Sequence, residues 1–378
     1  MKIAVLKETG DHEHRVAATP ETVKKLIGMG AEVTIESGAG EGASLPDALF
    51  EQAGASIAAD PSSTVAGADI ILKVRGPENL ESLAGAKPGA LLIAILNPYG
   101  ARAEIEALAK AGLTAFAMDF MPRITRAQSM DVLSSQSNLA GYKAVLEAAQ
   151  EYGRVFPMMM TAAGTVAPAR VFIMGVGVAG LQAIATARRL GAIVLATDVR
   201  PIAREQVESL GAKFVMVETE ESEQAETSGG YAREMSDDYK KKQAELIAET
   251  IKKQDIVITT ALIPGRPAPV LITDEMVKSM RPGSVIVDLA VEQGGNVTLS
   301  KPGQVTVVNG VKIVGHLNLP SRLAADASQF YAKNTLHFLA LLIDEETKEI
   351  KIDWEDEIIQ GTALTRDGAV IHPALGGD

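Results

Sequence analysis

Three glycines near the middle of the chain have the spacing of a phosphate-binding turn. Gly175, Gly177 and Gly180 follow a short apolar run, and an apolar helical pattern over residues 181–190 comes directly after them. In such a turn the first glycine permits a tight strand-to-helix connection and the second lets a pyrophosphate approach the backbone. The third lets helix and strand pack closely. The pattern therefore predicts a dinucleotide-binding turn.

An acidic residue stands where a dinucleotide site needs one. Asp198 ends a second apolar run, residues 192–197, about 20 residues beyond the glycines. A carboxylate at this point accepts hydrogen bonds from an adenosine ribose and repels a 2′-phosphate. Arg200 follows closely, and an arginine near this position can accept a 2′-phosphate. Because the carboxylate occupies the ribose position itself, the sequence favours NAD over NADP.

A second concentration of polar side chains lies at residues 121–142, after an expected strand at 114–119. It mixes guanidinium groups, amides, hydroxyls and a carboxylate: Arg123, Arg126, Gln128, Asp131, Ser134, Ser135, Gln136 and Asn138. Gln128 can both donate to and accept from an amide or a ribose, while Asp131 and Arg123 could pair and hold it. A solvated loop needs no such mixture, so we expect a functional cluster.

Helix capping is the alternative explanation for this segment. A helix is expected over residues 138–152, and Ser137 or Asn138 would be a suitable cap for it. Capping explains these two residues but leaves the arginine, glutamine and aspartate unexplained.

Two cationic side chains lie just beyond other expected strands. Arg15 and Lys73 could bind a carboxylate or a phosphate, Arg15 through a two-pronged contact and Lys73 as a point charge. They could equally be structural ion-pair partners of an acid such as Glu8. The residues alone leave both alternatives open.

Composition excludes several classes of protein. The chain contains no cysteine, which rules out disulfides and thiolate catalysis and favours a reducing compartment. A formal net charge of −12 and an aromatic content of 4% disfavour nucleic-acid binding. The five histidines lack zinc-ligand context, so we expect no metal site. The first residues are typical of a strand rather than a signal peptide, and no apolar run approaches the roughly 20 residues of a membrane span.

Strand and helix patterns alternate along nearly the whole chain. In the first half, strands are expected at 2–6, 32–36, 69–74, 90–96 and 114–119. In the second half they are expected at 170–175, 192–197, 213–218, 256–260, 284–289 and 311–315. Near-continuous Val, Ile and Leu runs are typical of parallel strands buried on both faces. The predicted fold class is α/β, with two Rossmann-like, doubly wound parallel-sheet domains separated by a cleft.

The end of the chain indicates a discontinuous first domain. A long helical pattern at 322–343 follows the last expected strand, and the tail beyond it is shorter than the roughly 50 residues of a domain. We therefore expect the tail to return to the first domain. The predicted domains are residues 1–137 together with 327–378, and residues 138–326, with the ligand in the cleft between them.

One connection is unusually long. It separates the expected strand at 213–218 from a helix that begins near residue 238, whereas most such connections have about 2–6 residues. Gly229 and Gly230 give it hinge freedom, and Tyr231 supplies a ring that could cover a cofactor. We expect a mobile lid; the alternative is a solvated acidic loop without a role.

Several long runs carry a family resemblance that covers nearly the whole chain. Residues 126–142, 175–183, 228–232 and 259–265 resemble, in register, the NAD(H)-binding component of proton-translocating transhydrogenases. The resemblance implies that hydride passes directly between NAD(H) on this component and NADP(H) on a separate one, coupled to proton movement through a membrane component. It also implies a homodimer on the cytoplasmic face of the inner membrane, held there through its complex.

The resemblance also assigns roles to individual residues. The family's Arg-Gln-Asp-Ser positions, at the nicotinamide end, fall on Arg123, Gln128, Asp131 and Ser134. The implied cofactor-binding positions are Gly175, Gly177, Val178, Ala179, Gly180, Asp198, Val199, Arg200, Gly230, Tyr231, Gln243, Thr260, Ala261 and Leu262. Among these, the glycine turn would hold the pyrophosphate and the tyrosine would belong to the lid.

Alanine dehydrogenase has the same fold and is the main alternative. Its substrate arginine and lysine match Arg15 and Lys73. Asn97, however, replaces its catalytic histidine, and Glu292 replaces its acid. Oxidation of an amine needs a proton acceptor near neutral pH, which histidine supplies and asparagine cannot.

Direct transfer between two nicotinamides needs only two aligned rings and the exclusion of water. The missing histidine therefore favours the transhydrogenase. An amino-acid dehydrogenase that uses another base, and a non-catalytic NAD-sensing module, stay open as alternatives.

Overall fold

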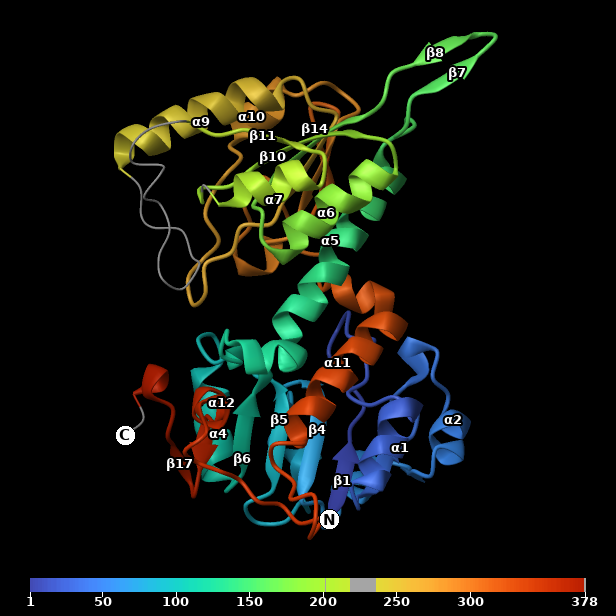
Figure 1. Cartoon of the computed structure of the whole chain (residues 1–378), viewed down its shortest axis with the longest axis vertical. Helices are drawn as coiled ribbons and strands as arrows, with labels where there is room; N and C mark the ends of the chain where they lie inside the picture. Colours follow the sequence, from blue (N-terminus) through green and yellow to red (C-terminus); the bar gives the residue numbers. More distant parts are fainter. Residues whose placement is uncertain (201, 218–235, 377–378) are drawn as a thin grey trace. The chain divides into compact units, whose positions relative to one another are not determined.

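The computed structural model describes residues 1–200, 202–217 and 236–376 (Figure 1). Gly230 and Tyr231, and with them the expected lid, lie outside these residues.

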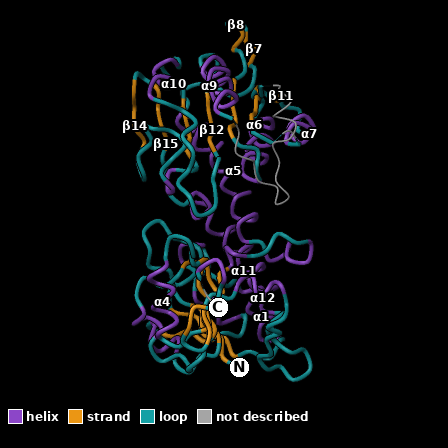
Figure 2. Tube along the Cα trace, turned by 90° about the vertical axis from the view of Figure 1, so that its left-hand side faces the viewer, coloured by secondary structure: helices purple, strands orange, loops and turns teal. Residues whose placement is uncertain are grey.

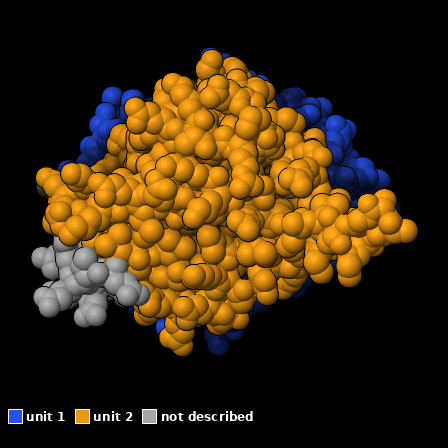
Figure 3. All heavy atoms as spheres, turned by 90° about the horizontal axis from the view of Figure 1, so that it is seen from above, with its two compact units in different colours: residues 1–136, 320–378 blue, residues 137–319 orange. Residues whose placement is uncertain are grey.

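The chain divides into two compact units, which Figure 3 colours separately. Unit 1 consists of residues 1–136 and 320–378, and unit 2 of residues 137–319. The division before residue 320 leaves helix α11 (Ala324–Leu339) whole, whereas the expected boundary between 326 and 327 would cut it.

Unit 1 contains a six-stranded sheet in which every neighbouring pair is parallel. Its spatial order is β3 (Ser56–Ala58), β2 (Glu32–Glu36), β1 (Lys2–Val5), β4 (Ile70–Arg75), β5 (Leu91–Ile95) and β6 (Thr114–Ala117). The buried residues of its strands are mostly Val, Ile, Leu and Ala, as expected of strands that are covered on both faces.

Helices cover both faces of this sheet. One apolar core cluster includes side chains of α1 (Pro20–Gly28), α2 (Asp47–Gln52) and α11, and another includes side chains of α3 (Pro61–Val65) and α4 (Arg102–Lys110). The tail returns to the same unit after α12 (Glu357–Thr362). The short strand β16 (Thr365–Arg366) lies beside β6, and β17 (Ala369–Val370) pairs with β16 and contacts α4.

Unit 2 contains a seven-stranded sheet that is parallel except at one edge. Its order is β11 (Lys213–Phe214), β10 (Ile193–Thr197), β9 (Arg170–Met174), β12 (Ile256–Thr259), β13 (Val285–Asp288), β15 (Val311–Val314) and the antiparallel β14 (Val305–Val308). Side chains of α5 (Val132–Glu151), α6 (Val178–Arg189) and α7 (Ala203–Ser209) join one core cluster of this unit. Side chains of α9 (Asp237–Ile251) and α10 (Asp274–Ser279) join a second cluster.

The predicted α/β fold class, with two Rossmann-like sheets, is confirmed. Figure 2 shows the strands of each unit with helices around them. Three details differ from the sequence-based expectations. Helix α5 begins at Val132 rather than at 138, and β11 has only two residues where 213–218 was expected. The strands β3 and β14 were not expected.

A hairpin in unit 2 was also not expected. Strands β7 (Met159–Thr161) and β8 (Gly164–Val166) pair antiparallel and extend away from the rest of their unit (Figure 1). Met158, which directly precedes the hairpin, and Met160 within it are 60% and 75% exposed. Every residue of both strands is exposed, so no alternation of apolar and polar residues marks them in the sequence.

Helix α11 owes its apolar character to unit 1. Tyr331, Phe338 and Leu339 belong to the core cluster of that unit. The apolar pattern at 322–343 is thus explained by packing within the chain. None of the helices that the structure describes is both long and apolar enough to cross a membrane.

Candidate nucleotide-binding site

Most of the predicted cofactor residues that the structure describes in unit 2 lie at the carboxyl ends of three adjacent strands. Strand β9 lies between β10 and β12, and the strand order reverses direction between β9 and β12. Beyond β9 comes the glycine turn, beyond β10 comes Asp198, and beyond β12 come Thr260, Ala261 and Leu262. A reversal of this kind is where open α/β sheets bind ligands.

Two of the three glycines are required by the chain itself. Gly175 has a φ of +99°, and a Cβ atom there would lie 2.5 Å from the Thr260 hydroxyl oxygen. A Cβ atom on Gly180 would overlap the carbonyl oxygen of Gly175. The strand, the turn and α6 therefore meet too closely for any side chain at either position.

Gly177 is different, because none of the residues that the structure describes requires a glycine there. It has φ −79° and ψ −166°, a conformation that any residue adopts, and precedes α6 as its N-cap. Apart from its two chain neighbours, no described residue has an atom within 4 Å of a Cβ atom placed on Gly177. The space before the N-terminus of α6 is thus open at the position where a pyrophosphate would approach, so these residues fit a dinucleotide. Val178 and Ala179 form the first turn of that helix.

Asp198 is held in place by four hydrogen bonds. Its carboxylate accepts from the backbone N–H of Val176 at 2.7 Å and from the backbone N–H of Arg200 at 2.9 Å. The Arg200 guanidinium donates through Nε at 2.9 Å and through Nη2 at 3.0 Å. The carboxylate thus joins the glycine turn, through Val176, to the end of β10. Val199 lies between Asp198 and Arg200, whose backbone N–H bonds the same carboxylate.

The turn after β12 is fixed by a buried asparagine that sequence reasoning missed. Asn296 accepts from Ala261 N–H at 3.1 Å and donates to the carbonyl oxygens of Ala261 at 2.9 Å and Pro269 at 2.8 Å. The buried carboxylate of Asp288 in turn accepts from the Asn296 backbone N–H at 3.2 Å. The available signal was an acid at the end of a buried strand followed shortly by Gly-Gly-Asn.

We expect Asn296→Ala to lower the free energy of unfolding by about 2–4 kcal/mol, because it leaves three half-buried backbone groups without these partners. Urea unfolding measures the change. Asn138→Ala is the matched control, since Asn138 is exposed and makes one long bond of 3.4 Å to Gln182. Equal losses in the two variants would show that the Asn296 bonds do not support the turn.

Gln243 and Thr260 also have structural partners. The Gln243 amide donates to the Thr197 hydroxyl at 3.0 Å and accepts from Val217 N–H at 3.3 Å, so it ties α9 to the end of β10. The Thr260 hydroxyl donates to the Gly175 carbonyl at 3.0 Å. Leu262 is exposed at the strand end. Gln243 therefore bonds the residue before Asp198, Thr260 bonds Gly175, and Leu262 follows Ala261, so each is next to another predicted nucleotide contact.

The polar cluster of residues 123–134 belongs to unit 1, where Asp131 caps α5. Its carboxylate accepts from the Ser134 backbone N–H at 2.9 Å and from the Ser134 hydroxyl at 2.6 Å. The Asp131 carboxylate thus serves the helix start through Ser134, and its pairing with Arg123 stays a prediction. The expected caps Ser137 and Asn138 are wrong, because both lie inside the helix.

Two other residues of this cluster contribute differently. The Gln128 side chain is exposed. Arg126, in contrast, forms a two-pronged contact with Asp356 at 2.6 and 3.0 Å, which attaches the tail of the chain to the cluster.

Arg15 is an internal ion-pair partner of Glu13. It is buried, and its guanidinium contacts the Glu13 carboxylate at 2.7 and 2.6 Å and the Gln136 amide oxygen at 2.8 Å. Arg75 adds a second cation to Glu13 at 3.2 Å. This arginine is therefore neutralised within unit 1, by Glu13 rather than by the Glu8 that we considered.

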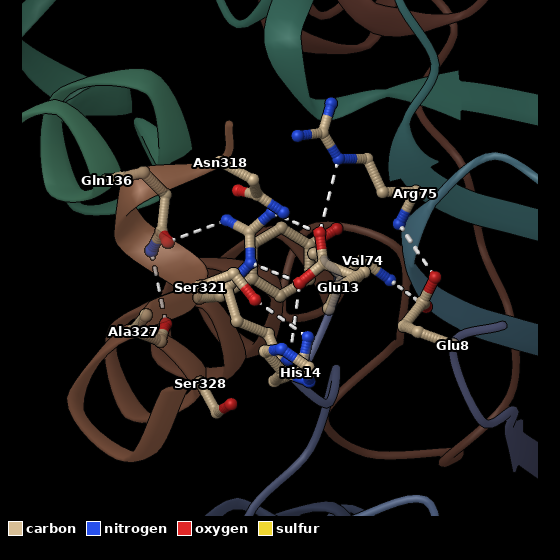
Figure 4. Close-up of polar contacts among 12 residues, drawn as sticks. Glu8, Glu13, His14, Val74, Arg75, Gln136, Asn318, Ser321, Ala327 and Ser328 are labelled. Carbon is tan, nitrogen blue, oxygen red and sulfur yellow. Dashed lines mark hydrogen bonds and ion pairs between the residues drawn. The ribbon is translucent and has the colours of Figure 1, made fainter. Parts of the chain in front are cut away.

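Lys73 has a comparable partner. Its ammonium lies 3.2 Å from the Glu8 carboxylate. The same carboxylate accepts from the Val74 backbone N–H at 2.7 Å (Figure 4). Burial raises the pKa of Glu8, and the Lys73 charge and the Val74 hydrogen bond oppose that shift.

The position at which alanine dehydrogenase carries its catalytic histidine has no base. Asn97 is exposed, has a φ of +48°, and donates its backbone N–H to Asp119 at 2.9 Å. Burial raises the pKa of Asp119, whose carboxylate supports the turn after β5. Among the residues that the structure describes, no three His, Cys, Asp or Glu side chains gather as a metal site.

The fold and the site together define a class of protein. The N-terminal domain of the alanine dehydrogenase/PNT family matches residues 4–140, and its C-terminal domain matches residues 144–373. The chain belongs to this family.

Its relatives include named transhydrogenase subunits. The chain is 58% identical over 381 residues to the first part of NAD(P) transhydrogenase subunit alpha from Rhodospirillum rubrum, an alignment that covers 100% of this chain and 99% of that protein. A crystal structure of transhydrogenase from Sinorhizobium meliloti is similar with a TM-score of 0.89 and 55% identity, covering 98% of this chain and 100% of that one. Alanine dehydrogenase of Halomonas elongata is 33% identical over 99% of this chain and 96% of that protein. The resemblance found in the sequence is confirmed.

Proposed function

We propose that this chain is the NAD(H)-binding component of a proton-translocating transhydrogenase. The observation that carries the nucleotide assignment is the open approach at Gly177, beside two glycines that the chain needs for its own packing. Similarity to the Rhodospirillum and Sinorhizobium proteins supports the choice of reaction. Stated fully, hydride would pass directly between NAD(H) here and NADP(H) on a partner component, coupled to proton translocation.

The chain's own residues would bind and orient. Backbone N–H groups of the turn from Gly175 to Gly180 would hold the pyrophosphate, and Asp198 would receive the adenosine ribose. NAD(H), when bound, supplies the nicotinamide that gives or takes the hydride. The turn from Thr260 to Leu262 would flank that ring.

The polar cluster of unit 1 would complete the nicotinamide end. Gln128, Arg123, Asp131 and Ser134 would orient the ring, with Asp131 and Ser134 acting through the rigid first turn of α5. Gly230 and Tyr231 would close over the nucleotide and keep water out, as a lid does. Alignment and dryness are what a transfer between two nicotinamides requires.

The chemistry of unit 1 argues against an amino-acid dehydrogenase. That reaction needs a free arginine for the substrate carboxylate and a base for its ammonium. Here Arg15 is engaged by Glu13 and Gln136, and Asn97 supplies no base.

With NAD⁺ and alanine we expect no increase in NADH absorbance from the chain alone. NADH should bind at least about tenfold more tightly than NADPH, because Asp198 disfavours a 2′-phosphate. Turnover of alanine, or a preference for NADPH, would contradict the proposal.

Assembly as a homodimer belongs to the same proposal, together with binding to an NADP(H) component and to a membrane component. The chain would then lie on the cytoplasmic face of the membrane through its complex. Exposed methionines on the β7–β8 hairpin support the dimer, since such an apolar projection is rarely left in water.

We expect the double change Met158→Gln and Met160→Gln to weaken the dimer by about tenfold or more in dissociation constant, because it removes apolar area from the contact. Sedimentation equilibrium measures the constant. Val307→Thr is the control, as Val307 is 63% exposed on the edge strand β14 of the same unit. If Val307→Thr weakened the dimer and the two methionine changes did not, the dimer contact would not lie at the hairpin.

A further inference from the structure

The carboxylate assigned to the ribose is fully engaged by donors of the chain itself. A carboxylate offers about four lone-pair positions. Asp198 uses four: two for the backbone N–H groups of Val176 and Arg200, and two for the Arg200 guanidinium. Arg200 also donates to the Val176 carbonyl at 3.1 Å, so its side chain is anchored on both the acid and the glycine turn.

A ribose therefore has to displace one of these donors. The two backbone N–H groups belong to the turns after β9 and β10 and cannot leave without rearranging them. The guanidinium can leave by rotating its side chain, which is 23% exposed, whereas that of Asp198 is only 8% exposed. Ribose hydroxyls and the Arg200 fork thus compete for the same oxygen atoms.

We propose that Arg200 is a specificity-determining residue that competes with the ribose of NAD(H) for Asp198. This inference rests on the proposed function. The competition lowers the affinity for NAD(H) and speeds its release, which a carrier of hydride needs because it exchanges nucleotide in every turnover. Once displaced, the guanidinium lies beside the ribose, where it can offset the repulsion between Asp198 and a 2′-phosphate. Arg200 therefore lowers the affinity for NAD(H) and raises the affinity for NADP(H), so the preference for NAD(H) becomes smaller.

The first test is Arg200→Met, which keeps the length of the side chain and removes the competing donors. We expect NADH to bind about fivefold to tenfold more tightly, from the loss of a charge-assisted pair that is partly exposed to solvent. NADPH should bind more weakly than to the unchanged chain. Calorimetric titration of the isolated chain gives both affinities, and stopped-flow dilution should show slower NADH release.

Arg200→Lys separates the effect of the planar guanidinium from that of the positive charge, and Arg189→Met is the control for a charge lost elsewhere in the unit. Lysine keeps the charge but lacks the planar fork, so its NADH affinity should lie between those of the unchanged chain and Arg200→Met. Arg189 is exposed at the last position of α6, the end opposite the glycine turn. Arg189→Met removes the same charge from the same unit and should leave the NADH to NADPH affinity ratio unchanged.

Asp198→Ala provides the decisive background. Without the carboxylate there is nothing for Arg200 to compete for, so adding Arg200→Met should no longer tighten NADH binding. Tighter binding that persists in this background would overturn the proposal, because the effect would not pass through Asp198. Weaker NADH binding by Arg200→Met alone would also overturn it and would make Arg200 a direct nucleotide contact.

The outcome is distinguishable from failure of the proposed function. If the unchanged chain binds no NADH, the function itself fails and the inference fails with it. If the unchanged chain binds NADH and Arg200→Met does not bind it more tightly, only the competition is refuted. Far-UV circular dichroism of every variant confirms that each is folded before its affinity is compared.

Discussion

Gly177→Val should abolish NADH binding and leave the chain folded. A Cβ atom at this position meets no described residue within 4 Å beyond its chain neighbours. The backbone there has φ −79° and ψ −166°, which valine adopts readily. The added side chain would instead occupy the approach of the pyrophosphate to the N-terminus of α6. We expect a loss of affinity of about 100-fold or more, which corresponds to roughly 3 kcal/mol. Titration with NADH measures it.

Gly180→Ala is the matched comparison. Its Cβ atom would overlap the Gly175 carbonyl oxygen, so this smaller change should cost about 3 kcal/mol or more of stability. Thermal unfolding should therefore separate the two variants, with a normal midpoint for Gly177→Val and a lowered one for Gly180→Ala. Normal NADH affinity in Gly177→Val would mean that no phosphate approaches this turn.

Gln128→Asn should slow hydride transfer by about 100-fold while changing NADH affinity less than about threefold, because a small misplacement of the reacting ring costs rate rather than binding. The Gln128 side chain is exposed and has no hydrogen bond among the described residues, so shortening it should not disturb the fold. Single-turnover transfer to an NADP analogue on the partner component measures the rate. NADH titration of the same preparation measures the affinity.

Ser129→Ala is the control for this position. Ser129 is also exposed and uses its backbone carbonyl, not its hydroxyl, to accept from Asn334 at 2.7 Å. Transfer should therefore continue at the normal rate. Equal losses of rate and affinity in Gln128→Asn would reduce Gln128 to a simple binding residue.

The parts of the fold that the sequence predicts are those with local signals. The strands around the glycine turn are continuous apolar runs, and the turn glycines have a fixed spacing, so both are readable without knowledge of tertiary structure. The hairpin β7–β8 lacks such a signal, because both of its faces are exposed.

The candidate site shows the same division. The placement of Asp198 at a strand end follows from the pattern, but its four donors depend on how the turns after β9 and β10 meet. Asp131 was interpreted as part of a functional cluster, although an acid followed three residues later by Ser134 is also a helix-start signal. Arg15 pairs with Glu13, two residues away, yet only the fold shows that Gln136 completes its coordination.

Hydride transfer in the reconstituted pair tests the central proposal most directly. The purified chain, loaded with NADH, is mixed with the purified NADP(H)-binding component carrying an oxidised NADP analogue, and reduction of the analogue is followed by stopped-flow absorbance. We expect rapid reduction in the mixture, none when either component is omitted, and none when alanine with NAD⁺ replaces NADH. Reduction by the chain alone, turnover of alanine, or no transfer in a mixture whose NADH site is demonstrably filled would contradict it.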